Sequence, residues 1–287
     1  MSLPLSVLLL VVACSLGWAG VDLLRKLLVA RVSPVALVFL LTVGVAPLFA
    51  AWMAVAGTSL PRPGYLLPAL TSVVLNVAAN LLYLEGMRIA PISVTVPLLS
   101  LTPAFASLLA IPLLGERPSA LHTLGILMVV AGAIALHWRR SVDDGRHGTL
   151  KGAVLVALTA LFWSLATPLD KLAVERADAP LHGFVLTAGV AVGVLLVLAV
   201  QGKLGDLGQV RQVPGIYLLS LIVSALALGL QLLALPQVFV GTVETLKRGI
   251  GNFMALLSGW VFFREPVTLR KSVAVGVMAV GVGLILT

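Results

Sequence analysis

The sequence predicts an all-α membrane protein with ten transmembrane helices arranged as two inverted five-helix repeats. Three observations predict this fold class: the composition, the spacing of the apolar runs and an internal repeat. Of the 287 residues, 60% are hydrophobic and 10% are charged, and the mean hydropathy is +1.13. An ordinary soluble domain carries about 25% charged residues. The composition therefore excludes a soluble enzyme, a nucleic-acid-binding module and a disordered tail protein.

Charged or Pro/Gly-rich breaks divide the chain into ten apolar segments. Each is long enough to cross about 30 Å of hydrocarbon as a helix, which satisfies its own backbone polar groups in lipid. The connections are short, so we expect no soluble domain and predict the lipid bilayer as a partner. The segments lie near residues 3–24, 33–56, 65–89, 92–114, 119–138, 150–170, 180–201, 213–236, 238–263 and 267–286.

The basic residues of the loops predict the orientation. When the loops are assigned alternately to two sides, thirteen Lys and Arg residues lie on one side and four on the other. Cytoplasmic loops carry the excess of basic residues. We therefore expect both termini outside the cytoplasm, and a multi-pass protein of the bacterial cytoplasmic (inner) membrane.

The two halves of the sequence repeat each other. The matches at an offset of 145 residues are 39–45 (FLLTVGV) with 184–190 (FVLTAGV), Trp18 with Trp163, and Lys26 with Lys171. Glu116 and Glu265 follow the fourth span of each half, at an offset of 149 residues. A series of matches in the same order indicates a true repeat.

Each repeat contains five spans, an odd number, so the second repeat enters the membrane in the opposite orientation. We expect a first repeat at 1–138, a polar linker at 139–148 and a second repeat at 149–287. Inverted repeats with a site near the membrane midplane are typical of secondary transporters that work by alternating access. The spans show no Walker-type motif and no acid–base, nucleophile or metal set, so the sequence favours a gradient-driven transporter over an enzyme.

Short motifs at equivalent places in the two repeats connect the chain to a known family. They are a tryptophan late in the first span of each repeat (Trp18 and Trp163) and the fourth-span endings 115–118 (GERP) and 264–266 (REP). With these motifs the whole chain resembles the drug/metabolite transporter superfamily, in its EamA-type branch. The resemblance implies a central cavity lined by spans one, three, four, six, eight and nine. It implies no particular substrate, and many relatives keep both termini in the cytoplasm.

Span nine carries three charges inside its apolar run: Glu244, Lys247 and Arg248. A basic residue near mid-membrane costs about 2.5–3.5 kcal/mol on insertion scales. Glu244 lies one turn before both cations and can neutralise one of them, which leaves one positive charge. Two donors that border a cavity suit a carboxylate or a phosphate. The Leu-Lys-Arg sequence is also similar to the ninth span of plastid sugar-phosphate translocators, where a basic pair holds phosphate.

A structural alternative to this anion site stays open. The spare cation could pair with Glu85 or Asp170 and join spans eight, nine and ten without binding a substrate. Gly249 and Gly251 would let a neighbouring helix or a substrate approach the backbone closely. The repeat-equivalent positions of the two cations are the leucines at 98–99, so the predicted site is asymmetric.

Five further residues are predicted to act in gating or in holding the structure. Lys26 and Lys171 lie over twenty residues from the starts of their helices, so we expect their side chains to extend to the membrane interface. Asp170, beside Lys171, is expected to cap a helix or to act in a gate. Glu85 and Arg88, three residues apart late in span three, are expected to form a pair.

The other predicted substrate contacts are amides and aromatic side chains. Asn76 and Asn80 share a face of span three with Tyr83, where amides either bond a neighbouring helix or line the cavity. The repeat relation of Trp18 and Trp163 favours the cavity, with helix packing as the alternative. The full predicted substrate-binding set is Lys247, Arg248, Glu244, Trp18, Trp163, Asn76, Asn80, Tyr83 and Asn252.

Together these features predict a secondary active transporter for a small organic metabolite that is anionic or zwitterionic. We expect a monomer or homodimer without cofactor or nucleic-acid partner. None of the four histidines has metal-ligand spacing with Cys, Asp or Glu, so no metal site is predicted. Two alternatives remain. One is a proton-coupled exporter of amino acids or drug-like cations with Glu244 as proton carrier, and the other is a flippase of a lipid-linked phosphate.

Overall fold

The computed structural model describes residues 4–58, 60–89, 98–137, 148–263 and 269–285, which contain ten α-helices and no strand. The helices are α1 (Leu5–Val29), α2 (Pro34–Ala56), α3 (Leu66–Ile89), α5 (Thr102–Leu114), α6 (Ala120–His137), α7 (Gly148–Val174), α8 (Ala179–Val200), α9 (Pro214–Ala234), α10 (Val240–Phe263) and α11 (Leu269–Ile285). Two short 3₁₀-helices, Leu204–Gln212 and Leu235–Gln237, flank α9. Each predicted span contains one of the α-helices, which confirms the predicted all-α fold class.

Most of these helices are suited to a lipid environment. Among the described residues, α1, α2, α3, α7, α8 and α9 are long and apolar enough to cross a membrane, and α5, α6 and α11 contain shorter apolar stretches. Val192, Leu196 and Val200 on α8 are 60%, 62% and 90% exposed. An outward face of this kind favours contact with lipid over contact with water.

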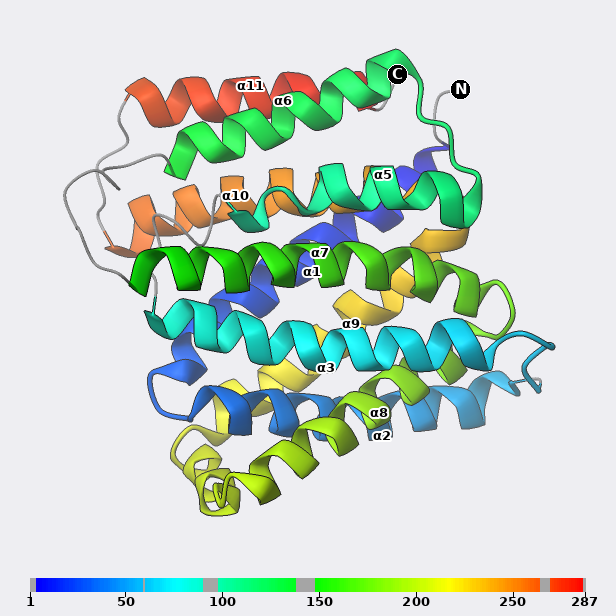
Figure 1. The fold of residues 1–287 in the computed structure, drawn as a ribbon, viewed down its shortest axis with the longest axis vertical. Helices are drawn as coiled ribbons and strands as arrows, with labels where there is room; N and C mark the ends of the chain where they lie inside the picture. Colours follow the sequence, from blue (N-terminus) through cyan, green and yellow to red (C-terminus); the bar gives the residue numbers. More distant parts are fainter. Residues whose placement is uncertain (1–3, 59, 90–97, 138–147, 264–268, 286–287) are drawn as a thin grey trace.

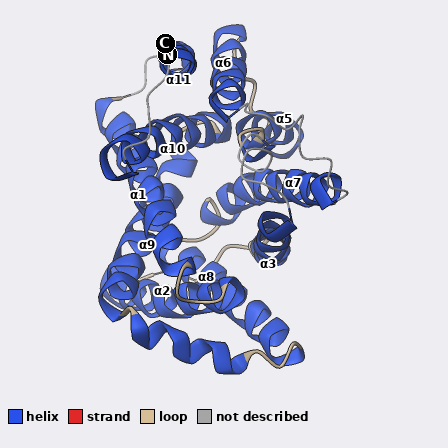
Figure 2. Ribbon diagram, turned by 90° about the vertical axis from the view of Figure 1, so that its left-hand side faces the viewer, coloured by secondary structure: helices blue, strands red, loops and turns tan. Residues whose placement is uncertain are grey.

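The packing partners of the helices follow the inverted repeat. α1 packs against α9 and α10, whereas its equivalent α7 packs against α3 and α5, the equivalents of α9 and α10. The equivalent helices α2 and α8 pack directly against each other, as do α6 and α11 (Figure 1). Figure 2 shows α1, α9 and α10 on one side of the bundle and α3, α5 and α7 on the other. Each side therefore combines helices from both repeats.

Glycines allow the closest approaches between helices. A Cβ atom on Gly125 of α6 would lie 2.5 Å from the backbone oxygen of Gly281 on α11. Similarly, a Cβ atom on Gly189 of α8 would lie 2.9 Å from the side chain of Val73 on α3. Small residues at these crossings bring the backbones close enough for van der Waals contact.

The fourth span differs from the single continuous helix predicted for 92–114. The chain turns at residues 100–101, and α5 begins at Thr102. Pro103 lacks the N–H that would bond the Leu99 carbonyl in a continuous helix. The Thr102 hydroxyl donates to that carbonyl instead, at 2.6 Å. The start of the predicted span lies outside the described residues.

Candidate substrate site

The charged part of α10 lies where this helix meets α1, α7 and α9. Lys247 Nζ donates to Glu244 Oε1 at 2.8 Å and to Gln231 Oε1 of α9 at 2.9 Å. The same ammonium group lies 5.2 Å from the ring centre of Trp18 on α1. Thr167 of α7 donates to Glu244 Oε1 at 3.2 Å. A carboxylate, an amide oxygen and an aromatic face all favour an ammonium ion, so this cluster holds Lys247 as a cation.

The cluster is buried and lies nearer the start of α10 than its end. Glu244 is 2% exposed, and the side chain of Lys247 is 16% exposed. Because α10 begins at Val240, Lys247 lies about 11 Å along a helix that is about 36 Å long. The charges therefore lie in the first third of α10.

Arg248 is the cation that this cluster does not neutralise. With the described residues it makes no ion pair, and its Nε is buried without an acceptor. Its charge acts on Tyr83 of α3 and on Glu244. Asp170, one of the two partners considered for a spare cation, bonds to side chains of α3 and α8 instead. That pairing is therefore wrong.

Three buried N–H donors of the predicted set have no acceptor. They are Trp18 Nε1, Arg248 Nε and Asn252 Nδ2, and the remaining unpaired buried side-chain atoms of the described chain are serine hydroxyls. Arg248 and Asn252 are four residues apart and share one face of α10. The Cys14 thiol lies beside Trp18, but it donates to the Ala227 carbonyl, and sulfur is a weak acceptor. An unsatisfied buried donor costs about 1–3 kcal/mol, so a ligand with acceptor oxygens would stabilise this region.

The two glycines of α10 that follow Arg248 most closely, Gly249 and Gly251, have different surroundings. A Cβ atom on Gly249 would lie 3.1 Å from Val282 of α11, so this glycine serves helix packing. A Cβ atom on Gly251 would meet no atom within 4 Å. Because Gly251 follows Lys247 by four residues, the two share a face of α10, and the space one turn beyond Lys247 is unfilled.

The region that the repeat relates to this cluster, where α7 meets α3 and the fourth span, is apolar. Trp163 of α7, the equivalent of Trp18, packs against Tyr83 with ring centres 5.4 Å apart. Leu98 and Leu99, the equivalents of the two cations, belong to the same hydrophobic cluster as Trp163. The structure therefore has the asymmetry that the sequence predicts: a tryptophan lies over a lysine on one side of the bundle, and a tryptophan lies beside leucines on the other side.

The two asparagines of α3 bond to their own helix. Asn76 Nδ2 donates to the backbone oxygen of Ser72 at 3.0 Å and to its hydroxyl at 3.2 Å, and Asn80 Nδ2 donates to the backbone oxygen of Asn76 at 2.7 Å. The Ser72 hydroxyl in turn donates to Asp170 of α7. These amide groups thus form a polar ladder along α3, and the bond from this ladder to α7 is made by Ser72.

A second ion pair lies one turn of α7 beyond the Lys247 cluster. Lys171 Nζ donates to Glu116 Oε1 at 2.7 Å and to the Val238 carbonyl at 2.8 Å. The Val240 N–H donates to Glu116 Oε2 at 2.9 Å. Lys171 and Glu116 are 8% and 7% exposed. The expectation that Lys171 extends to the membrane interface is therefore wrong, because a buried carboxylate binds its ammonium group inside the protein.

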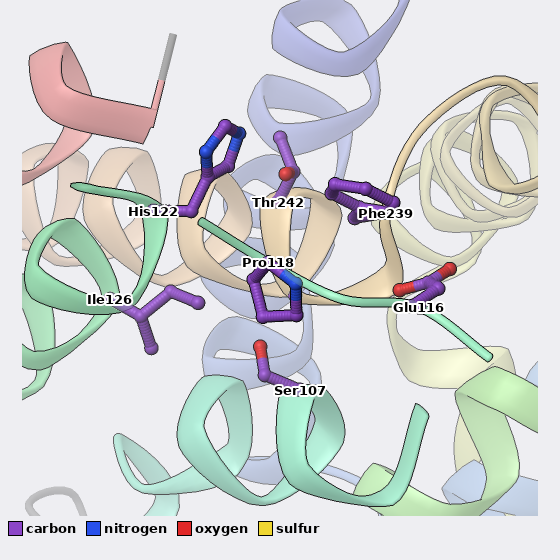
Figure 3. Close-up of a pocket in the computed structure, with 8 residues that line it drawn as sticks. Ser107, Glu116, Pro118, His122, Ile126, Phe239 and Thr242 are labelled. Carbon is purple, nitrogen blue, oxygen red and sulfur yellow. The ribbon is translucent and has the colours of Figure 1, made fainter. Parts of the chain in front are cut away.

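This ion pair ties segments together near one end of α7 and α10. It joins the end of α7, the segment after α5 and the start of α10. A pocket with room for roughly one water molecule lies next to it. Figure 3 shows this pocket, which is lined by Ser107, Glu116, Pro118, His122, Ile126, Phe239, Gly241 and Thr242. We refer to the Glu116–Lys171 pair as the closure pair.

Some of the residues predicted to act in the site or in gating have side chains outside the described residues. Conversely, some contacts of the site were not predicted from the sequence. The side chains of Lys26 and Arg88 lie outside the described residues, so the pair expected for Glu85 and Arg88 is not placed. Thr167 and Gln231 were not singled out, although an amide within an apolar span is a detectable signal. In the described ranges no group of three or more His, Cys, Asp or Glu residues is arranged to hold a metal ion.

Comparisons with known proteins agree with this architecture. Residues 5–138 and 150–287 each match the model of the EamA-like transporter family. An uncharacterized transporter of Methanothermobacter thermautotrophicus is 25% identical over 235 residues, which cover 77% of this chain and 64% of the relative. The chain thus spans slightly less than two thirds of that relative. A solved crystal structure has a TM-score of 0.80 and covers 98% of both chains, and its 17% identity supports a shared fold alone.

Proposed function

Since the chain belongs to the EamA-like transporter family, we propose that it is a secondary active transporter that moves a small anionic or zwitterionic metabolite by alternating access. The family match and the transporter relative point to a transporter and not to an enzyme. The apolar helices and the family make it an integral, multi-pass membrane protein. We place it in the bacterial cytoplasmic membrane.

The main evidence that the substrate has an anionic group is the surplus of buried hydrogen-bond donors around Arg248. Lys247 and Glu244 neutralise each other, so the positive charge that remains belongs to Arg248. An ionised carboxylate or phosphate would neutralise this charge and accept hydrogen bonds from Arg248 Nε and Asn252 Nδ2. The planar guanidinium group also matches both oxyanions in a bidentate arrangement. We therefore assign the main anion contact to Arg248 and the positioning of Glu244 to Lys247.

The Leu-Lys-Arg sequence at 246–248 supports phosphate as the anionic group, in line with the resemblance to sugar-phosphate translocators. A carboxylate has the same acceptor chemistry and belongs to the same proposal. The charge of Arg248 acts on Tyr83, and the ring of Tyr83 packs against Trp163. These two aromatic faces suit the organic part of the metabolite.

A thermal-shift screen of the purified protein tests this proposal. Anionic, zwitterionic and cationic metabolites are compared on the wild type, on Arg248→Gln and on Arg211→Gln. Arg211→Gln is the matched control because Arg211 is exposed on the 3₁₀-helix before α9. We expect anionic or zwitterionic metabolites to raise the unfolding temperature of the wild type and of Arg211→Gln, and Arg248→Gln to lose this stabilisation while unfolding at nearly the wild-type temperature without ligand.

Two results would overturn the proposal. One is stabilisation by cationic metabolites alone, which favours the exporter of drug-like cations. The other is anion-induced stabilisation that survives Arg248→Gln unchanged. Stabilisation by a phosphorylated polyprenyl lipid, with no response to water-soluble anions, would favour the flippase instead.

A further inference from the structure

A second buried polar cluster lies where α7, α8 and the start of α3 meet. The Ser72 hydroxyl donates to Asp170 Oδ1, and His182 Nε2 lies 3.1 Å from the same oxygen. The Tyr65 hydroxyl lies 3.3 Å from the other ring nitrogen of His182, Nδ1. His182 and Asp170 are 0% and 4% exposed. We call these four residues the Asp170 cluster.

The hydrogen bonds of the cluster indicate its charge. A phenol that donates to Nδ1 of His182 leaves the Nε2–H to donate to Asp170. Asp170 Oδ1 then accepts from both the Ser72 hydroxyl and the Nε2–H of His182. With a neutral imidazole and an ionised carboxylate, this arrangement gives the cluster one buried negative charge.

The end of α7 and the loop that follows it do not neutralise this charge. Lys171, the next residue, is bound to Glu116 in the closure pair. Arg176 Nη1 donates to a backbone carbonyl of its own helix turn. Within the described structure, His182 is the ion-pair partner of Asp170. No basic residue of this segment therefore pairs with the Asp170 carboxylate.

Among the described residues, the neighbouring elements add no cation that forms an ion pair with Asp170. Arg62, in the segment before α3, is exposed, and its backbone bonds to Arg176 and to Tyr65. α2 and α5 contain no ionisable residue. The charged residue at the start of α8 is Asp178, which is an acid and not a cation. From α10 comes Glu244, which is already paired with Lys247. A proton is the smallest cation that can enter such a packed site, and an Asp–His pair offers two groups that can accept it.

The cluster is placed close to one end of the bundle and is connected to the candidate substrate site. Asp170 is four residues from the end of α7 and His182 is three residues from the start of α8, so both lie within about 6 Å of a helix end. The ladder of Asn76 and Asn80 continues from Ser72 along α3 towards Tyr83, on which the charge of Arg248 acts. A change in the hydrogen bonds of Asp170 can therefore reach the substrate site along one helix.

We propose that Asp170 and His182, supported by Tyr65 and Ser72, form a proton-binding site whose occupancy is coupled to transport. One proton adds to the carboxylate or to the imidazole, no covalent bond between heavy atoms changes, and the charge of the cluster becomes zero. The proton site stands independently, whereas its coupling to an anion rests on the proposed function. This site, and not Glu244, takes the coupling proton.

Nuclear magnetic resonance of protein labelled with ¹⁵N-histidine tests the site directly. The ring nitrogens are followed in lipid nanodiscs from about pH 8 to about pH 5, the range in which an Asp–His pair can act as a switch. The signals of His182 are identified by their loss in His182→Gln and, if that variant does not fold, by their shift in Tyr65→Phe. Infrared spectra assigned with Asp170→Asn report a protonated carboxyl group.

We expect the wild-type pair to take up one proton in this range. Asp170→Asn should remove the transition or change its proton affinity at least about tenfold, which is one pH unit. The matched control is Glu175→Gln, which removes an exposed carboxylate five residues away and should leave the transition unchanged. If neither the His182 nitrogens nor the Asp170 carboxyl changes over this range, the pair only joins helices and the proposal is wrong.

Coupling is tested by repeating the thermal-shift measurements at both ends of the pH range, with inorganic phosphate and the anionic panel as probes. In each protein we compare the anion-induced rise in unfolding temperature at the two pH values. This rise should depend more strongly on pH in the wild type than in Asp170→Asn. Comparison with this variant removes the effect of the probe's own titration. An equal pH dependence in both proteins overturns the coupling. If no anion stabilises the wild type, the proposed function fails, while the spectroscopic titration still decides the proton site.

Discussion

Replacing Lys171 with methionine should open the end of the bundle that the closure pair holds shut. The Lys171 and Glu116 side chains are 11% and 7% exposed, and Nζ lies 2.7 Å from Oε1. Lys171→Met leaves the carboxylate of Glu116 buried with the Val240 N–H as its remaining described donor. Removal of one partner from a buried ion pair costs about 3–5 kcal/mol. Opening returns the carboxylate to water, so this cost shifts the closed–open equilibrium by roughly two to nearly four powers of ten.

The accessibility of a single thiol measures the opening. Cys14 is the sole cysteine of the chain and is fully buried, so Cys14→Ser provides a background without thiols. Thr242→Cys then places one thiol in the pocket beside Glu116, where Thr242 is 4% exposed. We expect a water-soluble maleimide to label this thiol at least about tenfold faster when Lys171 is methionine, because labelling follows the population of the open state.

Two further variants separate opening from general damage. Lys203→Met removes an exposed lysine and should leave labelling slow. Glu116→Gln combined with Lys171→Met removes both charges and should return labelling towards the slow rate, because no unpaired buried charge remains. The reasoning is refuted if Lys171→Met leaves labelling slow, whether or not the unfolding temperature falls.

The remaining predictions concern three other features. Glu244→Gln should strengthen anion-induced stabilisation in the thermal-shift screen, because Lys247 then adds an uncompensated charge. Gly125→Ala should cost about 1–3 kcal/mol and lower the unfolding temperature, since its Cβ meets the Gly281 backbone oxygen, whereas Gly283→Ala, beside open space, should not. A C-terminal fusion to a reporter that fluoresces only in the cytoplasm should stay dark, because the thirteen loop cations mark the opposite side as cytoplasmic.

Each of these predictions has a contrary result. Loss of anion-induced stabilisation in Glu244→Gln would make this carboxylate part of the binding site. Equal stability of Gly125→Ala and Gly283→Ala would mean that α6 and α11 do not approach as closely as described. Fluorescent cells would place the C-terminus in the cytoplasm, the orientation common among the relatives that the sequence resembles.

The helices and their repeat were predictable from local sequence patterns. Lipid allows few backbone structures, so apolar runs of sufficient length specify helices almost by themselves. Five spans per repeat then require opposite orientations, and the packing of α1 and α7 against equivalent neighbours agrees with this inference. The break at residues 100–101 was missed, although Pro103 is a visible signal, because the apolar run continues across it.

Part of the candidate site was predictable for a similar reason. Glu244, Lys247 and Arg248 stand out because charges are rare and costly in an apolar span. Trp18 was found through its repeat relation, and the structure places its ring against Lys247. These signals lie within one helix or follow from the repeat, so they can be read without knowledge of the packing.

The partner of each charge was decided by the tertiary structure. Lys171 binds Glu116, which is 55 positions away, whereas Tyr65 meets His182 across 117 positions. A buried charged or polar group bonds to whichever groups the packing brings within about 3 Å, and the sequence pattern of one helix does not state which helix lies beside it. For this reason the sequence identified Lys247 and Arg248 as costly cations, while only the packed bundle showed that Lys247 is neutralised and Arg248 is not.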